Sequence, residues 1–161
     1  GDSICEPENL GDCEEILDLA KKNNVKIFLP IDVVVSKSFS NSDKQKEVDI
    51  QNIPDGWQGL DIGTKTRKNF SDVVKQSNTI LWNGPMGVFE MSSFQNGTKA
   101  VAEAVAEATK KGSFSLVGGG DSVAAVKKFN LKDKMSFIST GGGAMLESLE
   151  GKVLPGIKAL Q

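Results

Sequence analysis

Leu116-Val117-Gly118-Gly119-Gly120-Asp121-Ser122 joins a short apolar run to a segment with helical character. Glycines directly after a strand let the backbone approach a ligand closely and adopt positive φ. The helix that follows presents free N–H groups and a partial positive charge at its first turn. This order of strand, glycine turn and helix is typical of an α/β protein, and the turn is a candidate cradle for an anion.

The same pattern recurs further along the chain. Residues 113–114 and 118–120 are matched by residues 136–137 and 141–143, where Ser-Phe again precedes a triple glycine. The echo is too short to indicate a repeat protein, but it predicts two glycine-rich helix starts on one edge of a sheet. The second turn has no acidic residue, so its backbone N–H groups are free to face bare anionic charge. The alternative for both segments is a simple strand-to-helix turn.

Asp121 is unexpected in an anion site, because a carboxylate repels phosphate. A Mg²⁺ ion between the two would remove the conflict, since Mg²⁺ prefers one or two carboxylates together with phosphate oxygens. Ser122 would add a hydroxyl donor. The alternative is that Asp121 only caps the helix.

A third candidate segment is residues 81–90, where a strand ends in Asn-Gly-Pro and a carboxylate follows. An acid near a strand end is well placed to accept hydrogen bonds from ribose hydroxyls, which makes Glu90 a candidate. Asn83 is placed to contact a polyphosphate, and Pro85 and Val88 to wall a nucleobase. The alternative is a β-turn anchored by a buried Trp82.

Periodicity and turn residues divide the rest of the chain into elements. Helices are predicted over residues 8–24, 64–77, 98–111, 122–129 and 144–150, strands over 25–29, 79–82, 113–117 and 135–139, an apolar run at 33–35, and an exposed loop over 36–47. Strands that alternate with helices predict a mostly parallel sheet with helices on its faces. Ligands bind such sheets beyond the carboxyl ends of the strands.

Composition narrows the function. The chain has 161 residues, enough for one domain, and a net charge of -2, which offers no basic surface for nucleic acid or anionic lipid. No apolar run is long enough to span a bilayer, and Cys5 and Cys13 are expected to be reduced thiols. Because the chain has no histidine, catalysis by histidine and metal binding through histidine are both excluded. It has neither a P-loop motif nor G-x-G-x-x-G.

Taken in order, these segments resemble phosphoglycerate kinase. The matching motifs are LPID at 29–32, GWQGLDIG at 56–63, WNGPMGVFE at 82–90, GGGDS at 118–122, STGGGA at 139–144 and EGKVLPG at 150–156. The resemblance implies a Rossmann-like three-layer αβα sandwich that forms an incomplete lobe of a two-lobed kinase. Residues 1–161 would be part of the C-terminal, nucleotide-binding domain. The N-terminal, phosphoglycerate-binding domain would be absent, as would a Gly-Gly-Ala-Lys motif with a catalytic lysine.

The resemblance also implies roles for individual residues. The adenine would be bordered by Gly59, Leu60, Pro85 and Val88, the ribose held by Glu90, and the phosphates contacted by Asn83, Gly119, Gly120 and Ser122. Asp121 would bind Mg²⁺. Gly141, Gly142 and Gly143 would support the transferring phosphoryl group and are the catalytic candidates.

The resemblance implies reversible phosphoryl transfer between 1,3-bisphosphoglycerate and ADP, giving 3-phosphoglycerate and ATP, in a cytoplasmic glycolytic monomer. The triose phosphates would be held by the absent lobe, so we expect this piece to be inactive alone. A second hypothesis is a nucleotide-binding or structural fragment without catalysis. A third is a nicotinamide-dependent oxidoreductase.

Overall fold

The computed structural model describes residues 1–41 and 44–160. The helices are α1 (Leu10–Lys22), α2 (Thr64–Lys75), α3 (Asn96–Lys110), α4 (Gly120–Lys128), α5 (Gly142–Leu149) and α6 (Pro155–Lys158). The strands are β1 (Asp32–Ser36), β2 (Gln45–Asp49), β3 (Gln58–Ile62), β4 (Thr79–Asn83), β5 (Phe114–Gly118) and β6 (Phe137–Ser139). Four short 3₁₀ helices lie at Pro7–Asn9, Ile50–Asn52, Ser92–Phe94 and Lys132–Lys134. Apart from residues 25–29, every predicted helix and strand is confirmed to within a few residues, and α6 and β3 were not predicted.

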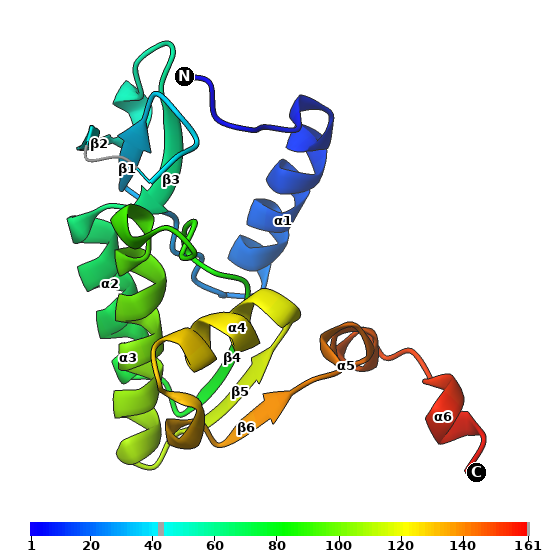
Figure 1. Ribbon diagram of the computed structural model, residues 1–161. Helices are drawn as coiled ribbons and strands as arrows, with labels where there is room; N and C mark the ends of the chain where they lie inside the picture. The colour runs from blue at the N-terminus through cyan, green and yellow to red at the C-terminus, as the bar shows by residue number, and fades with distance from the viewer. Residues whose placement is uncertain (42–43, 161) are drawn as a thin grey trace.

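Strands β4, β5 and β6 form a parallel sheet in that order (Figure 1). Their register pairs Asn83 with Gly118, and Gly118 with Ser139. The carboxyl ends of the three strands therefore lie in one row, and the two glycine turns and the Asn-Gly-Pro turn leave the sheet side by side.

The main core lies between this sheet and helices α3 and α4. Ile80, Trp82 and Val117 of the sheet are at most 8% exposed, and they belong to one cluster with side chains of both helices. On the opposite face, Leu81 and Phe137 are 46% and 58% exposed. This is the α/β class that the sequence predicts, as an incomplete domain whose helices cover one face of the sheet.

A second sheet, in the order β2-β1-β3, is antiparallel throughout, which the prediction of a mostly parallel sheet missed. The apolar run at 33–35 is its central strand, and part of the predicted loop over 36–47 is β2. Residues 42 and 43 of that loop lie outside the described residues. The polar sequence of β2 misled the prediction because an edge strand with exposed side chains needs no apolar pattern.

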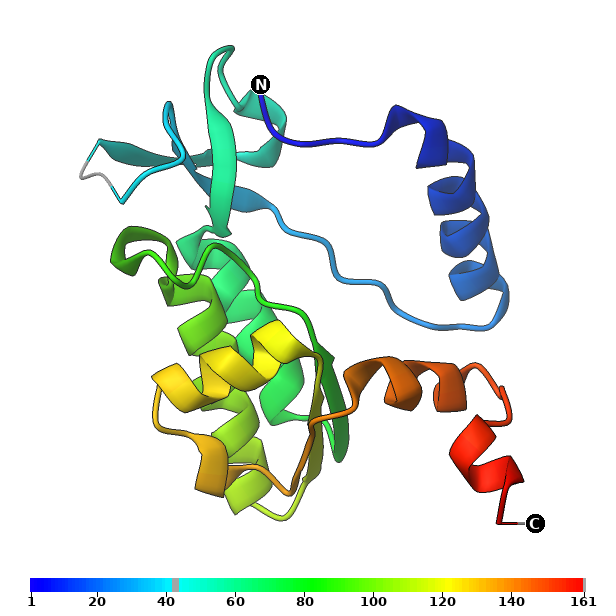
Figure 2. The same cartoon turned by 45° about the vertical axis from the view of Figure 1, so that its right-hand side comes forward.

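Residues 25–29 were predicted as a buried strand, and this was wrong. The segment is extended but joins neither described sheet, and Val25 and Leu29 are 59% and 63% exposed. Figure 2 shows that the segment leads from the end of α1 toward β1. An apolar β-branched sequence favours a strand only where a neighbouring strand accepts its hydrogen bonds.

Helix α1 stands apart from both sheets in Figures 1 and 2, and it buries no residue. Its apolar residues Ile16 and Leu17 are 58% and 46% exposed. In the part of the chain that the structure describes, no helix combines the length and apolarity needed to cross a bilayer.

Candidate functional site

The two predicted glycine turns lie against each other at the carboxyl edge of the parallel sheet. Gly119 has φ of +89° and is the N-cap of α4, and Gly142 is the first residue of α5. A Cβ added at Gly142 would lie 2.5 Å from the Gly119 nitrogen and 2.7 Å from its Cα. The expectation that both turns lie on one edge is confirmed, and the close approach requires glycine.

The first turns of α4 and α5 differ from those of α2 and α3. The Asp32 carboxylate accepts hydrogen bonds from Lys65 N–H and Thr66 N–H in the first turn of α2, each at 2.8 Å. Asp61 does the same for Gly97 N–H at the start of α3, also at 2.8 Å. Among the described residues, no side chain caps α4 or α5. Their first-turn N–H groups therefore remain available to an anion.

Asp121 and Ser122 lie in the first turn of α4 but in different surroundings. Asp121 is exposed, and it is not the helix cap, because Gly119 occupies that position. Ser122 is fully buried, and its Oγ accepts a hydrogen bond from Gly84 N–H at 2.6 Å. The hydroxyl predicted to contact phosphate is therefore already bonded to the loop after β4, while the Asp121 carboxylate faces outward.

The loop after β4 is held at the same edge. Trp82 is 4% exposed, and its Nε1–H donates to the Gly84 carbonyl at 2.7 Å, so a buried tryptophan does hold this loop. The Asn83 side chain lies against the Gly119 Cα, where its Oδ1 occupies the space that a Cβ would need. Asn83 is thus brought next to the first glycine turn.

The four residues predicted to border an adenine line one cavity. Gly59 and Leu60 come from β3, and Pro85 and Val88 come from the loop after β4; together they line a cavity of about 460 Å³. Val88 N–H donates to the Leu60 carbonyl at 2.8 Å, which ties the loop to the antiparallel sheet. The cavity is mainly apolar, and its size falls in the range of small-molecule sites.

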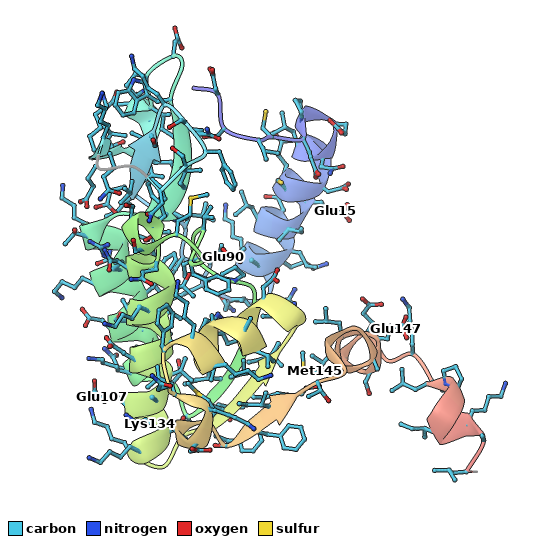
Figure 3. The ribbon with its side chains drawn as sticks, in the orientation of Figure 1. Glu15, Glu90, Glu107, Lys134, Met145 and Glu147 are labelled. Atoms are coloured by element: carbon cyan, nitrogen blue, oxygen red, sulfur yellow. The ribbon has the colours of Figure 1, made fainter. Side chains whose placement is uncertain are left out.

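Glu90 is exposed at the end of this loop, which crosses above α4 in the view of Figure 3. Lys128 holds the backbone on either side of Glu90, because its Nζ donates to the carbonyl oxygens of both Phe89 and Glu90. Sequence reasoning assigned Lys128 no role, because nothing distinguishes it from its neighbour Lys127 in the chain.

Asp61 is a second residue that sequence reasoning left without a role. It is 3% exposed in the cavity wall and accepts hydrogen bonds from Gly97 N–H and from its neighbour Ile62 N–H, at 2.8 and 2.9 Å. Burial raises the pKa of its carboxyl to about 6, although these hydrogen bonds and the charge of Arg67 oppose the increase. An acid inside an apolar strand was the signal available in the sequence.

The raised pKa predicts a pH-dependent stability. The unfolded carboxyl, with a pKa of 3.8, loses its proton first, so the free energy of unfolding should fall as pH rises from about 4 to about 6 and then level off. A pKa that differs by about two units between the unfolded and folded states changes the free energy of unfolding by about 3 kcal/mol. Urea unfolding of the chain and of Asp61→Asn across this range measures the effect, since other carboxyls cancel in the difference. Parallel curves would contradict the prediction.

The described residues contain no cluster of three or more Cys, Asp or Glu side chains suited to a metal ion, and the chain has no histidine. The exposed Asp121 carboxylate beside two uncapped helix starts does fit Mg²⁺, which takes one or two protein carboxylates and completes its shell with phosphate and water. The donor set therefore suits a metal that arrives with a phosphate ligand.

A parallel sheet whose carboxyl edge carries two packed glycine turns defines an α/β protein with its candidate site at that edge. The family model of phosphoglycerate kinase matches residues 1–152. The chain belongs to the phosphoglycerate kinase family.

Solved structures agree with this assignment. Phosphoglycerate kinase from Coxiella burnetii is 44% identical, with a TM-score of 0.92 over 98% of this chain. Phosphoglycerate kinase from Pyrococcus horikoshii OT3 is 34% identical, with a TM-score of 0.79 over 96% of this chain. This chain spans 40% and 36% of those two chains.

Proposed function

We propose that this chain supplies the Mg-ADP and Mg-ATP side of a phosphoglycerate kinase. The observation that carries the proposal is the contact between Gly119 and Gly142, which brings the two uncapped starts of α4 and α5 together. Two first turns with free N–H groups suit a polyphosphate, and membership of the phosphoglycerate kinase family indicates which one.

The proposed binding mode runs from the cavity to the glycine turns. The adenine would occupy the cavity lined by Gly59, Leu60, Pro85 and Val88, and the ribose hydroxyls would donate to Glu90. The phosphates would meet Asn83 and the backbone of Gly119, Gly120 and Ser122 at the start of α4. The Asp121 carboxylate would hold the Mg²⁺ that neutralises phosphate charge.

The proposed reaction moves the acyl phosphoryl group of 1,3-bisphosphoglycerate to a β-phosphate oxygen of ADP, which gives ATP and leaves a carboxylate. Attacking and leaving oxygens are both ionised, so no general base is needed, and positioning with charge stabilisation carries the catalysis. The start of α5, residues 141–143, is the proposed support for the migrating group. A chain without histidine is equipped for this chemistry.

The second candidate function is nucleotide binding without catalysis. The observation that favours it is the state of the sole arginine: Arg67 donates to the Thr64 hydroxyl at 2.6 Å and lies 3.9 Å from the Glu47 carboxylate. A triose phosphate is usually held by several free cations. The triose phosphates are therefore proposed to bind the remaining part of a two-lobed kinase.

We also propose a cytoplasmic location and a monomer for the whole kinase. Cys5 and Cys13 are both exposed and unpaired, which suits a reducing compartment. Neither nucleic acid nor membrane is a proposed partner, because the net charge is -2.

Calorimetry with Mg-ADP tests the proposal. The chain should bind Mg-ADP, but more weakly than a two-lobed phosphoglycerate kinase. Asp121→Ala should lower the affinity about 10–100-fold when Mg²⁺ is present and leave binding in EDTA unchanged. Asp133→Ala, at another exposed acid, is the matched control. No binding by the unsubstituted chain, or equal effects of Asp121→Ala with and without Mg²⁺, would contradict the proposed site.

A further inference from the structure

Lys128 is the last residue of α4, and its ammonium group makes three contacts with the loop that carries Glu90. Its Nζ lies 2.6 Å from the Phe89 carbonyl oxygen and 3.2 Å from the Glu90 carbonyl oxygen. It also lies 6.0 Å from the centroid of the Phe89 ring, within range of a cation–π interaction. One side chain therefore fixes both peptide planes that lead into and out of Glu90.

These contacts join a rigid support to an exposed carboxylate. Phe89 is 3% exposed and belongs to the core cluster that includes Val123 and Val126 of α4. Glu90, the next residue, is exposed. Because its own side chain buries little surface, the direction of the Glu90 carboxylate depends on how its backbone is held, and Lys128 holds that backbone from α4.

Helix α4 thus has a proposed ligand group at one end and Lys128 at the other. Asp121 lies in its first turn, beside the glycine turn, and Lys128 ends its last turn. The rise of an α-helix puts the two Cα atoms about 10 Å apart. Lys128 therefore contacts the Glu90 loop at the end of α4 that lies away from the phosphate turn.

We propose that Lys128 is a positioning residue for the ribose end of the nucleotide site. It orients the Glu90 carboxylate toward the ribose hydroxyls and sets its distance from the phosphate turn at the start of α4. The inference rests on the proposed function. Its consequence is that Lys128 governs recognition of the ribose diol and leaves recognition of the phosphates unchanged.

Three probes separate these two ends of the site: Mg-ADP, Mg-2′,3′-dideoxy-ADP and Mg-pyrophosphate, each titrated into the chain by calorimetry. The unsubstituted chain should prefer Mg-ADP over the dideoxy analogue about tenfold, the size of one hydrogen bond to a charged group. Lys128→Met keeps the aliphatic stem and should remove that preference, while affinity for the dideoxy analogue and for pyrophosphate stays within about twofold.

Two further variants complete the experiment. Lys127→Met, at the exposed neighbouring lysine, should behave like the unsubstituted chain. Lys128→Arg keeps a cationic donor and should recover most of the preference for ribose, which also tests the proposal if Lys128→Met proves unfolded by circular dichroism.

An equal loss of affinity for all three probes in a folded Lys128→Met variant would overturn the inference, because Lys128 would then support the fold alone. An unchanged preference for ribose would overturn it as well. A chain that binds pyrophosphate but shows no ribose preference would remove the role of Glu90, and with it that of Lys128. Failure of the unsubstituted chain to bind any probe would instead contradict the proposed function itself.

Discussion

A polypeptide of these 161 residues is expected to make no ATP from 1,3-bisphosphoglycerate and ADP above the uncatalysed background. Its one arginine, Arg67, is already bonded to Thr64 and faces Glu47, so the chain offers no free guanidinium group to hold a triose phosphate. Loss of one preorganised electrostatic donor lowers a rate about 10²–10³-fold. If the second substrate binds the remaining part of a two-lobed kinase, as proposed, its positioning is lost as well, which removes a further large factor.

A coupled assay for ATP, run at high concentrations of the purified chain, measures this. A two-lobed phosphoglycerate kinase assayed in parallel is the positive control. Turnover by the chain, with longer kinase excluded by mass spectrometry, would contradict the proposed division of labour between the two lobes.

Addition in trans of a polypeptide that carries the remaining part of a family member is expected to restore some turnover. The extended segment at 25–29 joins neither described sheet, and Phe28 lines an apolar cavity of about 330 Å³ with residues of α2 and α3. Such a surface can accept added apolar segments and gain stability from their burial. Turnover by the added polypeptide alone must be subtracted.

Gly142→Ala is expected to separate the two glycine turns and to lower both stability and turnover. Its Cβ would meet the backbone of Gly119 at 2.5 and 2.7 Å, and backbone cannot rotate away as a side chain can. Such crowding typically lowers the free energy of unfolding by about 1–3 kcal/mol. If α5 moves by about 1 Å, turnover in a two-lobed kinase that carries the same change should fall about 10²-fold.

Gly143→Ala provides the matched control one residue further along. Nothing lies within 4 Å of the Cβ that it adds, and it lies in the first turn of the same helix. Alanine in place of glycine in a helix is favourable by roughly 0.5–1 kcal/mol, so this variant should be slightly more stable. Urea unfolding of both variants decides the matter, and turnover is compared only for Gly142→Ala, because Gly143 belongs to the proposed support of the phosphoryl group. Similar behaviour of the two would show that the contact between the turns is unimportant.

Local patterns in the sequence were sufficient for several features of this protein. Glycine runs directly after apolar segments predicted strand-to-helix turns, and both turns lie at the carboxyl edge of a parallel sheet. The ordered motifs indicated the family. These features depend on backbone preferences of neighbouring residues, which are written in the chain itself.

Other features needed the tertiary structure, because they depend on partners that are distant in the chain. Residues 25–29 have the composition of a strand but no partner strand in the described sheets, while the polar β2 pairs with β1. Ser122 was predicted as a ligand group, and only the structure shows that its hydroxyl also accepts a hydrogen bond from Gly84 N–H, 38 residues away.

The Asp61 carboxyl and Lys128 show the same dependence at the candidate site. Asp61 owes its raised pKa to burial beneath α3, and Lys128 owes its proposed role to two carbonyl groups on another loop. Strand pairing, burial and long-range hydrogen bonds are properties of the assembled chain, so sequence pattern determined where the glycine turns lie, and packing alone decided which side chains surround them.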